Sequence, residues 1–232
     1  MLITSRPLDE YCAFFGLTRA RLRALPGPVL DCPGGAAALV AEARELGCRV
    51  VAADPAYARP AAELLAEAER ARRTMARAMP AAPHRYLAPR HLPYEKYLRS
   101  WDRARRLFAA DRATNPGSYL AAALPALPFA DGTFALTLSS YLLFAYPELF
   151  GPPAQLAALL ELVRVTAPGG EVLVHPLHDG AARRSPHLPQ LRAALGRHGV
   201  RSELRGHRAP GDGRRRYVLA LTRHRRYRPA HD

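Results

Sequence analysis

The sequence predicts an α/β fold, a single domain of 232 residues in which helices cover both faces of a mostly parallel sheet. Short apolar, β-prone runs alternate with longer helical patterns along the chain, which is typical of strands joined by helical crossovers. The clearest unit is Val29–Tyr57, where a strand, a glycine turn, a helix and a second strand follow one another.

Residues 1–27, ahead of this unit, are expected to form two short helices. Ser5 can cap the first helix, which Gly16 ends, and Thr18 can cap the second, which stops before Pro26. This N-terminal helical segment would lie against the edge of the sheet or cover the ligand site as a flap. The sequence leaves both arrangements open.

A glycine turn follows the first predicted strand. Val29 and Leu30 lead to Asp31, and Cys32-Pro33-Gly34-Gly35 comes next. Such a turn places backbone N–H groups and the start of a helix beside a ligand. The Asp31 carboxylate would repel a phosphate but could attract an ammonium group, which favours a cationic, phosphate-free nucleoside over a dinucleotide. The alternative is a structural turn whose glycines let the helix pack on the strand.

An acidic residue ends the second predicted strand. The helix after the turn stops at Gly47, and the apolar run Cys48–Ala53 then ends on Asp54, which Pro55 follows. Asp54 lies about twenty residues after Gly34, the spacing at which an acid binds ribose hydroxyls in nucleotide-binding units.

The turn resembles the first motif of the class I S-adenosylmethionine-dependent methyltransferases, an acid followed by three glycines at alternate positions. Pro33 stands at the first glycine position, Gly35 at the second and Ala37 at the third, so one of the three glycines is kept. The resemblance implies S-adenosylmethionine as cofactor. The residues it implies for cofactor binding here are Asp31, Cys32, Pro33, Gly34, Gly35, Asp54 and Pro55.

A long insertion, residues 56–117, separates the second predicted strand from the third. Helices are expected over Ala61–Met79 and Tyr94–Asp111, joined by a proline-interrupted segment. Because such a fold needs only one helix here, the extra length indicates a lid over the ligand, the alternative being an ordinary surface helical pair. The connecting segment holds residues that could contact substrate: His84, Arg85, Tyr86, Arg90 and His91.

A second motif precedes the fourth predicted strand, after a third strand expected over Tyr119–Leu124. Leu127–Phe134 is similar to the Leu-Pro-Phe-x-Asp-x-x-Phe-Asp pattern of the same family, with Ala135 in place of the last Asp. Where the family often has an adenine-binding acid, this chain has Ala123. The resemblance therefore implies that backbone around Leu124 and apolar contacts hold the adenine.

Ser139 and Ser140 end the fourth predicted strand, ahead of Tyr141. By position in the family they would contact the methionine end of the cofactor; the alternative is that their hydroxyls cap the next helix. The Asn/Asp-Pro-Pro-Tyr signature of many amino-group methylases is absent at this point of the chain.

A third motif joins a helix over Pro153–Val165 to the turn Pro168-Gly169-Gly170 and the strand Glu171–His175. Three motifs in the family's order imply its fold, a Rossmann-like seven-stranded, mostly parallel sheet with an antiparallel last strand. The expected helix Ser185–His198 and two final strands complete it. In detail the chain is most similar to a bacterial methyltransferase-like group of unassigned acceptor.

His175, His178 and Asp179 are weak candidates for catalysis. They follow the fifth predicted strand on the ligand side of such a sheet, and a His–Asp pair could deprotonate a hydroxyl or a phenol. The alternative is that they are ordinary polar groups of a turn. We expect no metal, because the two histidines lack a third ligand.

Composition sets further limits. The net charge of +14 indicates an anionic partner such as nucleic acid, but Lys96 is the only lysine, and arginine enrichment of this kind is also typical of a GC-rich genome. Few cysteines, no metal spacing and no membrane-length or secretory apolar run predict a cytoplasmic protein with reduced thiols and no membrane partner.

Together these features predict methyl transfer from S-adenosylmethionine to an unknown acceptor, with a small molecule as the leading expectation. A non-catalytic S-adenosylmethionine-binding or regulatory module and an RNA methyltransferase are the alternatives. The sequence does not predict the oligomeric state.

Overall fold

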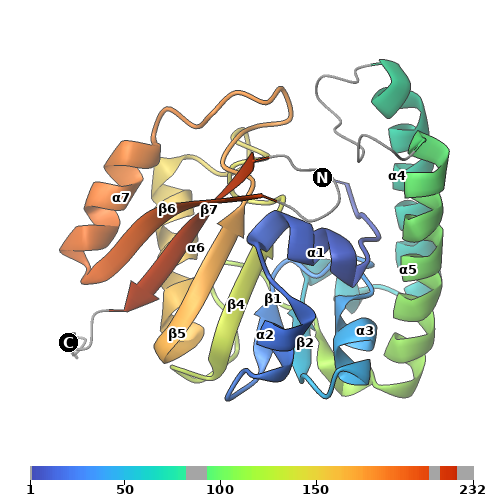
Figure 1. Cartoon of the computed structure of the whole chain (residues 1–232), viewed down its shortest axis with the longest axis horizontal. Helices are drawn as coiled ribbons and strands as arrows, with labels where there is room; N and C mark the ends of the chain where they lie inside the picture. Colours follow the sequence, from blue (N-terminus) through green and yellow to red (C-terminus); the bar gives the residue numbers. More distant parts are fainter. Residues whose placement is uncertain (1, 82–92, 209–214, 224–232) are drawn as a thin grey trace.

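The computed structural model describes residues 2–81, 93–208 and 215–223, and its centre is a seven-stranded sheet (Figure 1). The strands lie in the order β3-β2-β1-β4-β5-β7-β6. The strands β1 to β5 are parallel to one another, whereas β7 is antiparallel to both β5 and β6. This arrangement confirms the predicted fold class. The strands are β1 Val29–Asp31, β2 Val50–Ala53, β3 Tyr119–Leu120, β4 Phe134–Ser140, β5 Thr166–His175, β6 Val200–Arg208 and β7 Arg215–Arg223.

Helices cover both faces of this sheet. They are α1 Leu8–Phe15, α2 Arg19–Arg23, α3 Leu39–Glu45, α4 Ala61–Ala81, α5 Tyr94–Thr114, α6 Pro152–Val165 and α7 Leu188–Arg197, with short 3₁₀ turns η1 Pro55–Ala58 and η2 Pro116–Ser118. Successive strand residues point to opposite faces, so Leu173 packs in the core under α1 and α3 while Val172 and Val174 pack under α6 and α7.

The N-terminal helices form as predicted, and α1 lies on a face of the sheet. Gly16 ends α1 with φ of 65°, and the Thr18 side chain accepts a hydrogen bond from the Arg21 N–H at the start of α2. The cap of α1 differs from the prediction, because Pro7 and not Ser5 precedes the helix. Ahead of α1, residues Leu2, Ile3, Thr4 and Arg6 line the cavity described below.

The third strand is shorter than predicted. Residues 119–124 are expected to be strand, but β3 pairs with β2 only through Tyr119 and Leu120. Ala123 instead forms an isolated bridge with Ala126, so the chain turns at Leu124-Pro125 before it can continue along the sheet.

The predicted insertion contains the two expected helices, which pack as a hairpin at one end of the molecule (Figure 1). α5 is tied to the body of the protein, since its Trp101 and Phe108 are buried and its Asp111 accepts hydrogen bonds from Arg44 and Tyr119. The connecting residues His84, Arg85, Tyr86, Arg90 and His91 lie outside the described residues.

Within the described ranges, no helix is both long and apolar enough to cross a membrane.

Candidate functional site

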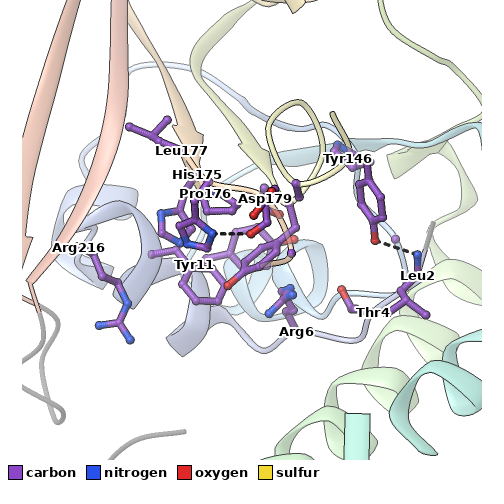
Figure 2. Close-up of a pocket in the computed structure, with 18 of the residues that line it drawn as sticks. Leu2, Thr4, Arg6, Tyr11, Tyr146, His175, Pro176, Leu177, Asp179 and Arg216 are labelled. Atoms are coloured by element: carbon purple, nitrogen blue, oxygen red, sulfur yellow. Dashed lines mark hydrogen bonds between the residues drawn. The ribbon is translucent and has the colours of Figure 1, made fainter. Parts of the chain in front are cut away.

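A cavity of about 660 Å³ lies over the carboxyl ends of β1, β4 and β5. In open α/β sheets this edge is where ligands bind, because the loops that follow the strands meet there. The wall is made by the N-terminal segment, the glycine turn, the α4–α5 hairpin, the segments after β4 and β5, and the β6–β7 pair (Figure 2).

The glycine turn is locked by hydrogen bonds within the protein. The Gly34 N–H donates to the Ala53 carbonyl oxygen, and the Gly35 N–H donates to Asp54 Oδ2 at 2.9 Å. Two further N–H groups, those of Ala36 and Ala38, donate to the N-terminal segment. The turn therefore does not present the row of open N–H groups expected from the sequence, and it offers no cradle for a phosphate.

The N-terminal segment supplies the acceptors for the start of this helix. The Thr4 carbonyl oxygen accepts from the Ala36 N–H and the Arg6 carbonyl oxygen accepts from the Ala38 N–H. On the other side of the cavity the Leu2 N–H donates to the Tyr146 hydroxyl at 3.1 Å (Figure 2). Residues 2–6 thus form a strap across the cavity, held at both sides.

Gly34 is required by packing on β2. A Cβ at this position would clash with the Tyr57 hydroxyl and stand 2.7 Å from the Ala52 Cβ. The same Tyr57 hydroxyl donates to the Gly35 carbonyl oxygen at 2.8 Å. The turn is therefore fixed from β2 and η1 as well as from the strap.

Asp54 lines the cavity and is almost fully buried. Its Oδ2 accepts from Gly35 and its Oδ1 accepts from the Ala56 N–H at 2.8 Å. Burial raises the pKa of Asp54, and these two backbone hydrogen bonds oppose the shift. Since a carboxylate has about four lone-pair sites, Asp54 keeps acceptor capacity toward the cavity.

Asp31 is buried behind Tyr11 and does not line the cavity. The Tyr11 hydroxyl donates to Asp31 Oδ2 at 2.8 Å, while Oδ1 has no hydrogen-bond partner among the described residues. Burial raises the pKa of Asp31 to about 8, with a smaller contribution from the nearby Asp54 charge. Tyr11, and not Asp31, is the group that reaches the cavity wall.

The structure brings together part of the set of residues predicted from the sequence. Those that line the cavity are Pro33, Gly34, Gly35, Asp54, Ser140, His175, His178 and Asp179. Those that lie outside its wall are Asp31, Cys32, Pro55, Ala123, Leu124 and Ser139. Ser139 is buried, and its hydroxyl has no partner among the described residues, whereas Ala123 is exposed.

A buried arginine in an aromatic setting is the main feature that sequence reasoning missed. The Arg6 guanidinium carbon lies 4.1 Å from the centre of the Tyr141 ring and 5.2 Å from that of Trp101. Its Nη1 pairs with Glu10 at 2.7 Å, and the Trp101 indole N–H donates to the same carboxylate. An Arg and a Glu four residues apart at the start of an apolar helix were the available signal.

Tyr141 follows β4 in an uncommon backbone conformation, with φ of 52°. Its N–H donates to the His175 carbonyl oxygen at 2.7 Å, which continues the β4–β5 pairing by one residue. Positive φ at a non-glycine residue is enriched at ligand sites, and here it places the Tyr141 ring in the cavity wall.

The three candidate catalytic residues adopt separate roles. His175 donates from Nδ1 to the Tyr217 carbonyl oxygen at 3.2 Å and stacks on Phe14, and burial lowers its pKa to about 3. His178 Nδ1 bonds to the Asp179 carbonyl oxygen at 2.9 Å. Because a carbonyl oxygen can only accept, His178 donates this hydrogen bond from Nδ1.

The Asp179 carboxylate is committed to its own turn, where it accepts from the Ala181 and Arg183 N–H groups and pairs with the Arg183 guanidinium at 2.8 Å. These hydrogen bonds and the Arg183 charge lower the pKa of Asp179. A side-chain His–Asp pair is therefore not formed. Within the described ranges no group of three His, Cys, Asp or Glu side chains could hold a metal ion.

Comparison with known proteins gives structural matches only. No family model matches the chain, and no curated protein matches it. It is similar to magnesium protoporphyrin IX methyltransferase from Synechocystis with bound S-adenosylmethionine, with 12% identity, coverage of 94% of this chain and 76% of that one, and a TM-score of 0.49.

It is also similar to the 1,6-didemethyltoxoflavin-N1-methyltransferase of Burkholderia thailandensis with bound S-adenosylhomocysteine, at 18% identity, coverage of 88% and 76%, and a TM-score of 0.44. An antibiotic-resistance methyltransferase matches at 17% identity, coverage of 89% and 94%, and a TM-score of 0.43. Identities this low carry no information on the substrate.

Proposed function

We propose that this chain transfers a methyl group from S-adenosylmethionine to a small molecule. The observation that carries the proposal is the cavity over β1, β4 and β5, bounded by the glycine turn, by Asp54 and by the polar ends of β4 and β5. This combination of an acid after β2 with a glycine turn after β1 is the arrangement that binds a nucleoside at the switch point of such sheets.

The locked turn supports a donor without phosphate groups. Each N–H from Gly34 to Ala38 has an acceptor within the protein, so a pyrophosphate would find no open backbone donors there. S-adenosylmethionine has no phosphate group, and its sulfonium is positively charged. Both properties suit a site in which the Asp54 carboxylate accepts a hydrogen bond from the turn. Dinucleotides fit the same site poorly.

The residues present fit the nucleoside and amino-acid parts of this donor. Asp54 keeps acceptor sites that can bind ribose hydroxyls, and Gly35, whose N–H donates to Asp54, lines the cavity beside it. Ser140 and Tyr11 bring hydroxyl groups to the adjacent wall at the end of β4, where the amino-acid part would lie. The donor itself supplies an electrophilic methyl group on sulfur.

The chain's own contribution to transfer is to hold the acceptor in line and to exclude water. Proximity and desolvation supply much of the rate of such displacements, so a strong base is needed only for an acceptor that is protonated at neutral pH. For that case His178 is the best-placed base, since the residue lines the cavity and its hydrogen bond to the Asp179 carbonyl oxygen is made by Nδ1 and not by Nε2.

The experiment is calorimetric titration with S-adenosylhomocysteine, followed by incubation with cell extract and donor labelled in its methyl group. Binding in the micromolar range together with a labelled small-molecule product is the expected result. Binding without any labelled product would favour the non-catalytic module. Transfer of the label to RNA would favour the RNA methyltransferase. In that case the affinity of the protein for RNA should also fall steeply as the salt concentration rises.

A cytoplasmic location is part of the same proposal. All three cysteines, Cys12, Cys32 and Cys48, are buried and unpaired in the described structure. Free core thiols of this kind are typical of proteins in a reducing compartment.

A further inference from the structure

The two ends of the cavity differ in charge. The end at the glycine turn carries Asp54, whereas the end at β6–β7 carries Arg184, Arg215 and Arg216. Among the described residues that line this second end, Asp179 carries a carboxylate, and it pairs with Arg183 and accepts backbone hydrogen bonds. Within the described part of the wall, this carboxylate is therefore engaged by Arg183 and is not paired with Arg184 or Arg215.

Arg184 and Arg215 converge on one aromatic ring although they come from different elements. Arg184 lies in the loop after β5 and Arg215 begins β7, and their guanidinium carbons lie 5.4 and 5.3 Å from the centre of the Tyr217 ring. Stacking of this kind holds a guanidinium in place while its N–H groups stay available. No carboxylate among the described residues lies within ion-pair distance of either side chain.

Apolar side chains line the wall next to these arginines. Leu177 follows β5, Leu188 begins α7, and Leu204 stands on β6 with 42% of its surface exposed. An exposed leucine beside two stacked arginines forms a surface that suits a ligand with an apolar body and a charged group at one end.

We infer that the methyl acceptor is an apolar small molecule with an anionic group, a carboxylate, sulfonate or phosphate, which Arg184 and Arg215 bind. The inference rests on the proposed function and deepens it by naming the acceptor class. Guanidinium groups bind such anions through paired N–H donors, and two of them from separate elements would fix the acceptor's orientation.

Arginine is abundant in this chain, so the test must separate these two side chains from general positive charge. The probes are 2-naphthoate and its uncharged counterpart 2-naphthamide, which have the same shape. Each is titrated calorimetrically, in the presence of S-adenosylhomocysteine, into the wild type and into the double variant Arg184→Gln/Arg215→Gln. The matched control is Arg197→Gln/Arg201→Gln, which removes two exposed charges from outside the cavity wall.

The wild type is expected to bind 2-naphthoate about tenfold or more tightly than 2-naphthamide, as for hydrogen bonds to a charged group. Arg184→Gln/Arg215→Gln should abolish this preference, while the control variant should keep it. Equal binding of the two probes by the wild type, an equal loss in the control, or no binding of 2-naphthoate would each overturn the inference. Titration with S-adenosylhomocysteine alone separates these outcomes from failure of the proposed function, which would show as no donor binding.

Discussion

Asp54 Oδ2 accepts a hydrogen bond of 2.9 Å from the Gly35 N–H, so the acid that follows β2 holds the turn that follows β1. The two sequence features that predict nucleotide binding are thus one structural unit. Asp54 also caps η1 through Oδ1, which means that its carboxylate serves the fold in addition to any ligand.

Asp54→Ala is expected to weaken binding of S-adenosylhomocysteine and also to lower stability. Two backbone N–H groups lose their acceptor, which costs about 1–3 kcal/mol for each one left buried and unsatisfied. Asp54→Asn keeps one amide oxygen as acceptor and should lose less stability. Calorimetric titration and urea unfolding of both variants measure the two effects; an unchanged affinity in folded Asp54→Asn and Asp54→Ala would place the ribose elsewhere.

Gly35→Val is expected to abolish donor binding. Gly35 has φ of 55°, and a Cβ there would stand 3.1 Å from the Thr4 carbonyl oxygen, so a branched side chain would displace the strap from the turn. The control is Gly47→Val, which shares a positive φ of 74° but has nothing within 4 Å of the added Cβ. If both variants bind S-adenosylhomocysteine alike, backbone strain and not the site explains any loss.

The sequence predicted the scaffold well because its signals are local. β1, the turn, Asp54 and the helices of the insertion all follow from apolar periodicity and from glycine, proline and cap positions in short windows. The strap could not be predicted, since the carbonyl groups of Thr4 and Arg6 bond to the turn through backbone atoms, which leave no side-chain pattern.

The same distinction applies within the site. The place of Asp31 at the end of β1 predicts that its carboxylate attracts a ligand, but Tyr11 of α1 binds this carboxylate and lines the cavity in its place. The contacts of Arg6 with Tyr141 and of Arg184 with Tyr217 form only through the tertiary fold, at sequence separations that no local pattern reports.

Glu10→Gln is expected to destabilise the protein by about 3–5 kcal/mol, because it leaves the buried Arg6 charge without its partner. A glutamine oxygen can still accept from the Trp101 indole N–H, so the loss reports the charge. The matched control is Glu69→Gln, which breaks an exposed i,i+4 pair with Arg73 and should cost about 0.5 kcal/mol or less. Urea unfolding measures both, and similar losses in the two variants would contradict the importance of burial.

Asp31→Asn is expected to change how stability depends on pH. The folded protein holds the Asp31 proton up to a pKa of about 8, whereas the unfolded chain releases it near its ordinary value of 3.8. The folded state therefore binds more protons between about pH 4 and pH 8, and this contribution to stability is complete below pH 4 and lost as pH rises through 8.

The slope from one such group is at most about 1.4 kcal/mol per pH unit. Asparagine cannot ionise, so the variant should lack this slope while the Tyr11 hydroxyl still donates to its amide oxygen. Urea unfolding of wild type and Asp31→Asn at pH 5, 6, 7 and 8 gives the comparison. Parallel stability curves over that range would mean that Asp31 ionises normally in the folded protein.

The two ends of the α4–α5 hairpin are held differently, and this difference tests the predicted lid. Near the sheet, Leu64 and Phe108 belong to the main core and Arg112 donates to the Tyr57 carbonyl oxygen. At the far end Met75 and Met79 pack in a separate small cluster, chiefly against Leu98 and Trp101 of α5. Because the two methionines and Trp101 line the cavity, this far end can respond to a ligand.

Amide exchange over residues 75–81 is therefore expected to slow on addition of S-adenosylhomocysteine, and to slow more when an acceptor is also bound. Residues 104–114 of α5, held by the body, should show only the general slowing that any ligand gives by stabilising the folded state. The segment that joins the two helices lies largely outside the described residues, so the methionine end of α4 is the better reporter. Equal slowing in the two segments would indicate that the hairpin lines the cavity without moving, because a lid must gain order at its moving end.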